Sequence, residues 1–165
     1  MFAYGSNMFA ARIAQRCPSA KPLGVAELRG HELRWHKQSQ DGSGKCDVVV
    51  ARDPGAVVFG VLYEMASVDK SNLDRAEGLG AGYEEKEIEV FHNGAPSTVT
   101  AYFATATDPT LRPYTWYRSL VVAGAKEHRL PAHYIERLEA TDAIEDKDQQ
   151  RHATKLLLIE RAARQ

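Results

Sequence analysis

The sequence has few of the residues that build disulfide frameworks or metal centres. Its two cysteines, Cys17 and Cys46, belong to no CxxC or zinc-binding pattern. The six histidines form no His-Glu-x-x-His motif. Pro131 separates His128 from His133, so these two do not share one helix face. We therefore expect no metal site, and we expect the reducing conditions of the cytoplasm.

Long apolar runs and an excess of charge of one sign are also lacking. No stretch approaches the ~18 consecutive apolar residues of a membrane-spanning helix. No basic segment followed by an apolar one opens the chain, as it does in an export signal. The 21 basic and 22 acidic residues give a formal net charge of −1. We therefore expect binding neither to nucleic acid nor to a membrane.

The size and composition are those of an ordinary globular domain. The chain has 165 residues, of which 44% are hydrophobic and 26% charged, and it contains no internal repeat. We expect a single domain over residues 1–165, with a C-terminal helix over about 146–164 as an extension. The stretch 38–45 is the only candidate flexible segment. It is interpreted either as a mobile hairpin tip or as a lid.

Strand patterns dominate the first part of the sequence, and helix patterns the last. The segments that read as strands are 2–4, 23–37 with a break at Gly30, 48–50, 57–65, 84–91 and 98–105. Those that read as helices are 8–16, 68–77, 114–126, 131–139 and 146–164. Asn93-Gly94 is the strongest hairpin signal. This order favours an α+β fold with a mainly antiparallel, barrel-like sheet and flanking helices over a parallel doubly wound sheet.

Most catalytic motifs are incomplete. The residues around Ser6 lack the second glycine of a G-x-S-x-G nucleophile elbow. Cys17 ends a predicted helix, where the helix dipole disfavours a thiolate. The glycines at 78, 80 and 82 form no GxGxxG motif, and no P-loop lysine follows them. A hydrolase of this kind or a phosphate-binding loop is therefore not supported.

A turn at the start of the chain is the first candidate feature. Gly5 permits a positive φ, and Ser6 or Asn7 stands where it could cap the helix predicted from residue 8. The first N–H groups of a helix have no partner within it, so they can bind a carboxylate or another anion. Two interpretations stay open: a simple helix cap, or an anion site.

Glu77 is the second candidate feature. It falls at the end of a predicted helix, where a carboxylate meets the negative end of the helix dipole. If it is also buried, it becomes suited to general acid and base catalysis near neutral pH. The glycines that follow let the backbone pass close to a ligand. The alternative is a solvated carboxylate followed by a flexible loop.

Four segments between the first residues and about Ala140 form a recognisable set. They are Tyr4-Gly5-Ser6-Asn7, Glu77-Gly78, Tyr117 with Val122–Ala125, and Lys126–Tyr134, which contains Leu-Pro-x-x-Tyr. In order and spacing they resemble the γ-glutamylcyclotransferases. The turn alone is moderately specific, and its combination with Glu-Gly and Leu-Pro-x-x-Tyr is much more so. The resemblance does not extend beyond residue 140.

The resemblance implies both a fold and a reaction. The fold is a compact α+β arrangement around a small β-barrel. The reaction needs no cofactor: a γ-glutamyl amino acid or amine, the small-molecule substrate, cyclises to 5-oxoproline and releases the free amine. Glu77 is the implied catalytic residue. The implied substrate-binding residues are Tyr4, Gly5, Ser6, Asn7, Tyr83 and Tyr117. The spacing between Glu77 and the predicted strand at Ile88–Val90 is one residue longer than the resemblance implies. Glu84 is therefore an alternative to Tyr83 as the substrate-binding residue.

The chemistry of cyclisation agrees with these residues. The substrate ammonium must lose a proton before it attacks the γ-carbonyl, and Glu77 can accept that proton and return it to the leaving nitrogen. Both reacting groups are tethered in one molecule, so little entropy is lost on ring closure. N–H groups of the turn or a tyrosine hydroxyl can stabilise the tetrahedral intermediate.

Three other functions stay open at this stage. The first is an enzyme of the same fold acting on γ-glutamylamines or on another γ-glutamyl-tagged metabolite. The second is a non-catalytic module that binds a small carboxylate. The third is an interaction protein that uses the C-terminal helix, although Leu156 and Ile159 fit a core better than an interface. The sequence does not predict the oligomeric state.

Overall fold

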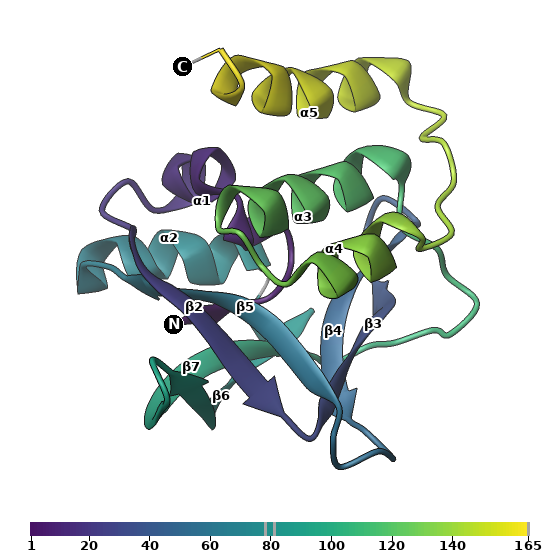
Figure 1. Ribbon diagram of the computed structural model, residues 1–165. Helices are drawn as coiled ribbons and strands as arrows, with labels where there is room; N and C mark the ends of the chain where they lie inside the picture. The colour runs from purple at the N-terminus through teal and green to yellow at the C-terminus, as the bar shows by residue number, and fades with distance from the viewer. Residues whose placement is uncertain (78, 81, 165) are drawn as a thin grey trace.

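The computed structural model describes residues 1–77, 79–80 and 82–164. Strands fill most of the chain up to residue 104, and helices fill most of the rest (Figure 1). The elements are β1 (Phe2–Ala3), the short 3₁₀ helix η1 (Ser6–Met8), α1 (Ala10–Arg16), β2 (Lys21–Arg29), β3 (His31–Gln38), β4 (Gly44–Val50), β5 (Val57–Glu64), α2 (Ser67–Glu77), β6 (Tyr83–His92), β7 (Ala95–Ala104), α3 (Thr115–Glu127), α4 (Ala132–Glu139) and α5 (Gln149–Ala162).

The main sheet confirms the α+β class and the antiparallel pairing. Its five strands lie in the order β1-β5-β2-β6-β7, and every neighbouring pair is antiparallel. The hairpin predicted at Asn93-Gly94 joins β6 to β7. Both residues have positive φ, 51° and 78°, as the favoured two-residue hairpin turn requires.

The expected closure into a β-barrel is not found, because β3 and β4 form a separate two-stranded sheet. Gly30, with a φ of 68°, turns the chain from β2 in one sheet to β3 in the other. The two sheets meet through isolated bonds instead of a continuous ladder. The Ala104 N–H donates to Asp47 Oδ1 at 2.9 Å, and the Gln38 N–H donates to the Ala106 carbonyl at 2.9 Å.

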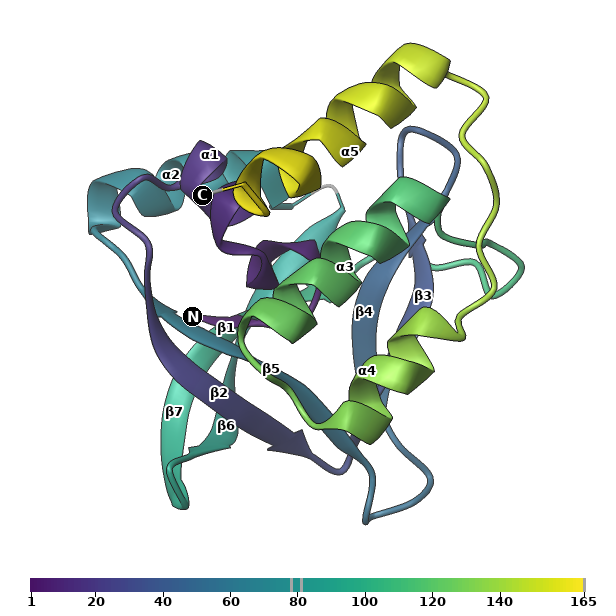
Figure 2. The ribbon, with the colours of Figure 1, turned by 45° about the horizontal axis from the view of Figure 1, so that its top comes forward.

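The helices gather on one side of the main sheet, with α5 outermost (Figure 1). A second view shows α5 crossing above α1 and α3 (Figure 2), and α5 contacts both of these helices. Leu156 and Ile159 of α5 pack against the main hydrophobic core. No helix in the described ranges has the length and apolarity needed to cross a membrane.

Strand β1 is fixed to β5 from the first residue. The Met1 ammonium donates to the Tyr63 carbonyl at 2.9 Å, and the Tyr63 N–H donates to the Met1 carbonyl at the same distance. Gly60 of β5 allows the close approach of the two strands, because a Cβ there would lie 2.4 Å from the Ala3 carbonyl oxygen. The Phe2 side chain is buried. The turn that follows β1 therefore starts from an anchored strand.

Candidate active site

A small pocket brings all the predicted site residues together. It lies where β1, η1, β4, α2, β6, β7 and α3 meet, and its volume is about 40 Å³. Seven of its lining residues were predicted from the sequence: Tyr4, Gly5, Ser6, Asn7, Glu77, Tyr83 and Tyr117. The others include Cys46 and Tyr102, which belong to no sequence motif. We call this space the turn pocket.

Gly5 is required for space and not for a positive φ. Its φ is −115°, so the positive φ that a glycine permits is not adopted there. A Cβ at this position would lie 3.1 Å from Cys46 Cβ and 3.2 Å from Tyr117 Oη. Both distances are tighter than ordinary van der Waals contact. A glycine therefore lets the turn lie directly against β4 and α3.

Ser6 and Asn7 do not cap a helix. The predicted helix over 8–16 begins at Ala10, and neither it nor η1 is capped by the side chain of the residue that precedes it. The Ala10 N–H donates instead to Glu127 Oε2 at 2.8 Å, while Ser6 Oγ accepts from Arg12 Nε at 2.9 Å. Among the hydrogen bonds of the described residues, none uses the backbone N–H of residues 5, 6 or 7 as a donor. Within the described ranges these donors therefore have no partner.

Glu77 is the last residue of α2, as the sequence predicts. Its side chain is 14% exposed, so the alternative of a fully solvated carboxylate is wrong. Oε1 accepts from Asn7 Nδ2 at 2.9 Å and is paired with Arg16 Nη1, which also donates to Asn7 Oδ1 at 2.8 Å. The described residues provide no hydrogen bond to Oε2. Gly78, the second residue of the predicted Glu-Gly motif, lies outside the described ranges.

Two tyrosines contact the backbone of Cys46, one at its carbonyl and one at its N–H. Tyr83 Oη donates to the Cys46 carbonyl at 2.8 Å, and Tyr117 Oη accepts from the Cys46 N–H at 3.2 Å. Burial raises the pKa of both tyrosines well above the ordinary value, so their hydroxyls stay protonated. Glu84, the alternative to Tyr83, points to solvent and pairs with Lys86 at 2.7 Å. It does not line the pocket.

Tyr4 and Cys46 complete the wall of the turn pocket. The Tyr4 hydroxyl donates to the Tyr102 carbonyl, and burial raises its pKa well above the ordinary value. Burial also raises the pKa of the Cys46 thiol to about 12. A thiol that stays protonated is a poor nucleophile. In the described part of the chain, no three His, Cys, Asp or Glu side chains gather as a metal site would require.

A second cavity of about 260 Å³ adjoins the turn pocket and shares Ser6, Glu77, Tyr83 and Tyr117 with it. Ser39 and Asp41, from the candidate lid at 38–45, line this cavity. Tyr114 Oη donates to the Asp41 carbonyl at 2.9 Å and holds the loop against α3. A larger cavity of about 850 Å³ lies between β3, β5 and α4, and it contains none of the predicted residues.

Arg12 and Arg16 were not predicted from the sequence. Both are on α1, and both contact turn residues, Ser6 and Asn7 respectively. A basic residue in the last turn of a helix is common because it complements the helix dipole. Nothing in the local pattern distinguishes these arginines from surface residues, and only the three-dimensional arrangement places them at the site.

Comparison with known proteins identifies the family of the chain. The AIG2-like family matches residues 57–138. The γ-glutamylcyclotransferase of Homo sapiens is 34% identical over 147 residues, which cover 86% of this chain and 77% of the relative. That of Mus musculus is 35% identical over 152 residues, with 88% and 80% covered.

A solved structure named γ-glutamyl cyclotransferase superposes with a TM-score of 0.84 at 29% identity. It covers 97% of this chain and 96% of its own. The match therefore reaches beyond residue 140, where the sequence motifs end, and into α5. By sequence identity over most of both chains, and by fold, this chain belongs to the γ-glutamylcyclotransferase family.

Proposed function

We propose that this enzyme converts a γ-glutamyl amino acid or amine to 5-oxoproline and the free amine, with Glu77 as general base and acid and without a cofactor. One observation carries the proposal. Glu77 uses a single oxygen, Oε1, for its contacts with Asn7 and Arg16. The other oxygen, in the same pocket, can therefore accept a proton from a substrate.

The turn is the proposed binding site for the substrate α-carboxylate. The backbone N–H groups of Gly5, Ser6 and Asn7 follow one another in a tight bend, a geometry that suits anions. A carboxylate held there directs the neighbouring α-ammonium toward Glu77, since Asn7, a residue of the turn, donates a hydrogen bond to Glu77. Tyr4, Tyr83 and Tyr117 line the pocket beside the turn and are the proposed contacts of the glutamyl chain.

The reaction is a transfer of the γ-acyl group from one nitrogen to another. Glu77 accepts a proton from the α-ammonium, and the free amine attacks the γ-carbonyl carbon to close a five-membered ring. The carbonyl becomes an oxyanion, to which the neutral Tyr117 hydroxyl can donate a hydrogen bond. The bond from this carbon to the leaving nitrogen then breaks. The attacking nitrogen loses two protons and the leaving nitrogen gains two, so the Glu77 carboxylate is regenerated.

Arg16 and Asn7 position the Glu77 carboxylate. Their bonds to Oε1 fix the rotation of the group, so that Oε2 has a defined direction. The positive charge of Arg16 also offsets the unfavourable helix dipole at the end of α2. Such positioning matters because proton transfer requires hydrogen-bond contact with the substrate ammonium.

The experiment is to incubate the protein with a panel of γ-glutamyl amino acids and amines and to detect 5-oxoproline by mass spectrometry. The Glu77→Gln variant keeps the shape of the side chain and removes the base, so we expect a loss of about 10²-fold or more in kcat. Glu84→Gln, on the exposed face of β6, is the matched control. A folded Glu77→Gln protein with the wild-type rate would refute the proposal. Ligand binding with no product would indicate a non-catalytic binding module.

Two further properties are proposed with this function. Cys17 and Cys46 are both free and buried, which supports a reducing compartment such as the cytoplasm. The packing of Leu156 and Ile159 against the main core supports a single domain that includes α5. Size-exclusion chromatography with light scattering will give the oligomeric state.

A further inference from the structure

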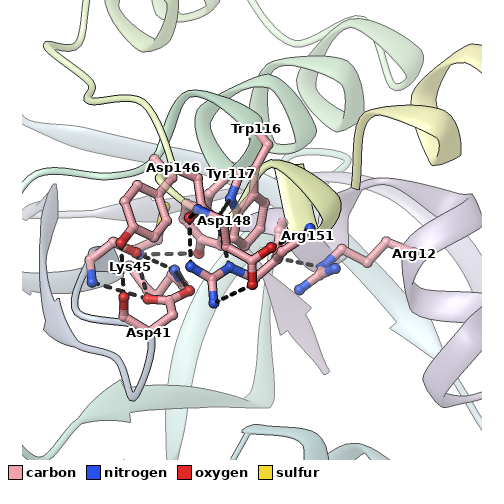
Figure 3. A network of polar contacts seen from close by, with 12 residues as sticks. Arg12, Asp41, Lys45, Trp116, Tyr117, Asp146, Asp148 and Arg151 are labelled. Atoms are coloured by element: carbon pink, nitrogen blue, oxygen red, sulfur yellow. Dashed lines mark hydrogen bonds and ion pairs between the residues drawn. The ribbon is translucent and has the colours of Figure 1, made fainter. Parts of the chain in front are cut away.

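The cavity beside the turn pocket carries a strong excess of positive charge. Its charged lining residues are Arg12, Arg16, Lys37, Lys45, Arg151 and Lys155, against only Asp41 and Glu77. These cations come from α1, from the consecutive strands β3 and β4, and from α5 (Figure 3 shows part of the group). We call this space the cationic cavity. Its charge contrasts with the net charge of −1 for the whole chain.

Half of these cations have a carboxylate partner. Arg16 pairs with Glu77, and Lys45 pairs with Asp41 at 2.7 Å. Arg151 donates to the buried Asp146 through Nε at 2.6 Å, and Trp116 donates to the same carboxylate at 2.8 Å (Figure 3). These pairs neutralise their members and hold α5 and the loop at 38–45 in place.

The other half have no such partner. Among the described residues, no carboxylate lies within salt-bridge distance of Arg12, Lys37 or Lys155. Arg12 Nε donates to Ser6 Oγ, Lys37 lies 4.8 Å from the centre of the Tyr83 ring, and Lys155 lies 5.9 Å from that of Trp116. Neutral oxygens and aromatic rings compensate a buried cation only in part.

The pKa values of these three side chains reflect the free-energy cost of burying a charge without a carboxylate partner. Burial, together with the neighbouring Arg16, lowers the pKa of Arg12 to about 10. Burial also lowers the pKa of Lys37 and of Lys155, and for Lys155 the nearby arginines act in the same direction. For Lys37, Glu77 and Asp41 partly oppose the effect of burial. An anionic ligand in the cavity would offset the desolvation cost of all three cations and the repulsion by neighbouring cations that acts on Arg12 and Lys155.

The cavity lies where the leaving group must go. It shares Glu77 and Tyr117 with the turn pocket, and the scissile bond must lie next to these two side chains if Glu77 protonates the leaving nitrogen. The glutamyl part occupies the turn on one side of that bond. The substituent of the leaving amine therefore extends into the cationic cavity.

We propose that the cationic cavity selects γ-glutamyl compounds whose leaving group is a dicarboxylic amino acid, with Arg12, Lys37 and Lys155 as specificity-determining residues. The inference rests on the proposed function. A neutral amino acid brings one carboxylate to three unpartnered cations, and a simple amine brings none. A dicarboxylic leaving group brings two, so it neutralises more of the charge that has no carboxylate partner among the described residues.

The test compares acidic substrates with their neutral isosteres. We expect kcat/KM to be at least 10-fold higher for γ-glutamyl-aspartate than for γ-glutamyl-asparagine, and likewise for γ-glutamyl-glutamate over γ-glutamyl-glutamine. The ratio should fall as salt is raised, because salt screens the attraction. Equal kcat/KM values within each pair would overturn the inference. A complete absence of 5-oxoproline from these four compounds and from the whole panel of γ-glutamyl amino acids and amines would refute the proposed function instead.

Two substitutions test whether Lys37 and Lys155 cause the preference for acidic over amide substrates. Lys37→Met and Lys155→Met, on β3 and α5, should each reduce the acid-to-amide ratio at least threefold, mainly through KM for the acidic substrate. Arg161→Met, on an exposed position of α5, is the control and should keep the wild-type ratio. Because the two lysines lie on different elements, one variant still tests the inference if the other fails to fold. A ratio that neither variant changes would overturn the role of these lysines.

Discussion

Asn7 Nδ2 lies 2.9 Å from Glu77 Oε1, although 70 positions separate the two residues in the chain. This bond joins the turn after β1 to the end of α2. Arg16 closes a triangle by contacting both side chains. These three contacts therefore join the proposed carboxylate site to the proposed base. Loss of any one of them should weaken the other two.

Asn7→Ala tests the first of these contacts. Removal of the amide leaves Glu77 with Arg16 alone, so the carboxylate gains rotational freedom and Oε2 loses its defined direction. We expect kcat to fall about 10- to 100-fold, and we expect a stability loss of about 1 kcal/mol from the missing hydrogen bonds. Steady-state kinetics and urea unfolding measure the two effects. Asn72→Ala, on an exposed position of α2, should change neither.

Tyr117→Phe tests the proposed oxyanion donor. The variant keeps the ring that packs against Trp35 and Trp116 but removes the hydroxyl 3.2 Å from the Cys46 N–H. We expect kcat to fall about 10²-fold with little change in KM, because the donor acts mainly on the intermediate. Since the pKa of Tyr117 is raised well above 10, the wild-type rate should show no loss from tyrosine ionisation up to pH 9. A kcat unchanged by the substitution would remove Tyr117 from the mechanism.

Gly60→Ala tests the anchoring of β1 without altering any proposed site residue. The new Cβ would lie 2.4 Å from the Ala3 carbonyl and 2.7 Å from the Phe2 ring, so β1 must move away from β5. We expect a loss of about 1–3 kcal/mol in stability and a loss of activity larger than the unfolded fraction explains. Deletion of residues 1–3 should abolish activity altogether. An active deletion variant would show that the turn keeps its position without the strand.

Asp146→Asn tests the clamp that holds α5, by which we mean the hydrogen bonds from Arg151 and Trp116 to the Asp146 carboxylate. Hydrogen bonds from Arg151 keep the pKa of Asp146 well below its usual range, against the opposing effect of burial. Because the folded-state pKa is lower than the unfolded value of about 3.9, the stabilisation is complete above that value and is lost as the pH falls below it. Wild-type stability should therefore decline below about pH 4. The variant should be less stable by about 1–3 kcal/mol at pH 7 and should decline less steeply.

The control for this prediction is Asp142→Asn. Asp142 pairs with Arg112 at 3.0 Å, but its side chain is 72% exposed, and surface pairs contribute little. Urea unfolding at pH 7, 5 and 3.5 compares the three proteins. The clamp would be excluded if Asp146→Asn and Asp142→Asn gave the same profile.

Features that depend on local chemistry were predictable from the sequence. Asn93-Gly94 gave the hairpin between β6 and β7, since few other residues adopt two successive positive φ values. Glu77 was placed correctly at the end of α2. Gly30 was identified as a break, but its consequence, the division of the strands into two sheets, depends on pairing between distant segments.

The site was predictable where motifs exist. The turn, Glu77, Tyr83 and Tyr117 gather in one pocket, whereas Arg12, Arg16 and Cys46 have no sequence signal because their neighbours in space come from other elements. Gly5 was singled out because a glycine permits a positive φ, whereas in the structure it provides space for close packing against Cys46 and Tyr117. A glycine retained for close packing and one retained for a positive φ look the same in a sequence.

Because of the position of α5, the residues proposed for catalysis and those proposed for leaving-group selectivity lie largely on different elements. The base and the turn come from β1, η1 and α2, while α5 contributes Lys155 and Arg151 to the cationic cavity and none of the lining of the turn pocket. Exchange of residues 149–162 could therefore change which substrate is accepted while the reaction stays the same. For protein engineering, α5 is therefore the segment to exchange. A new helix must keep an arginine that donates to Asp146, as Arg151 does.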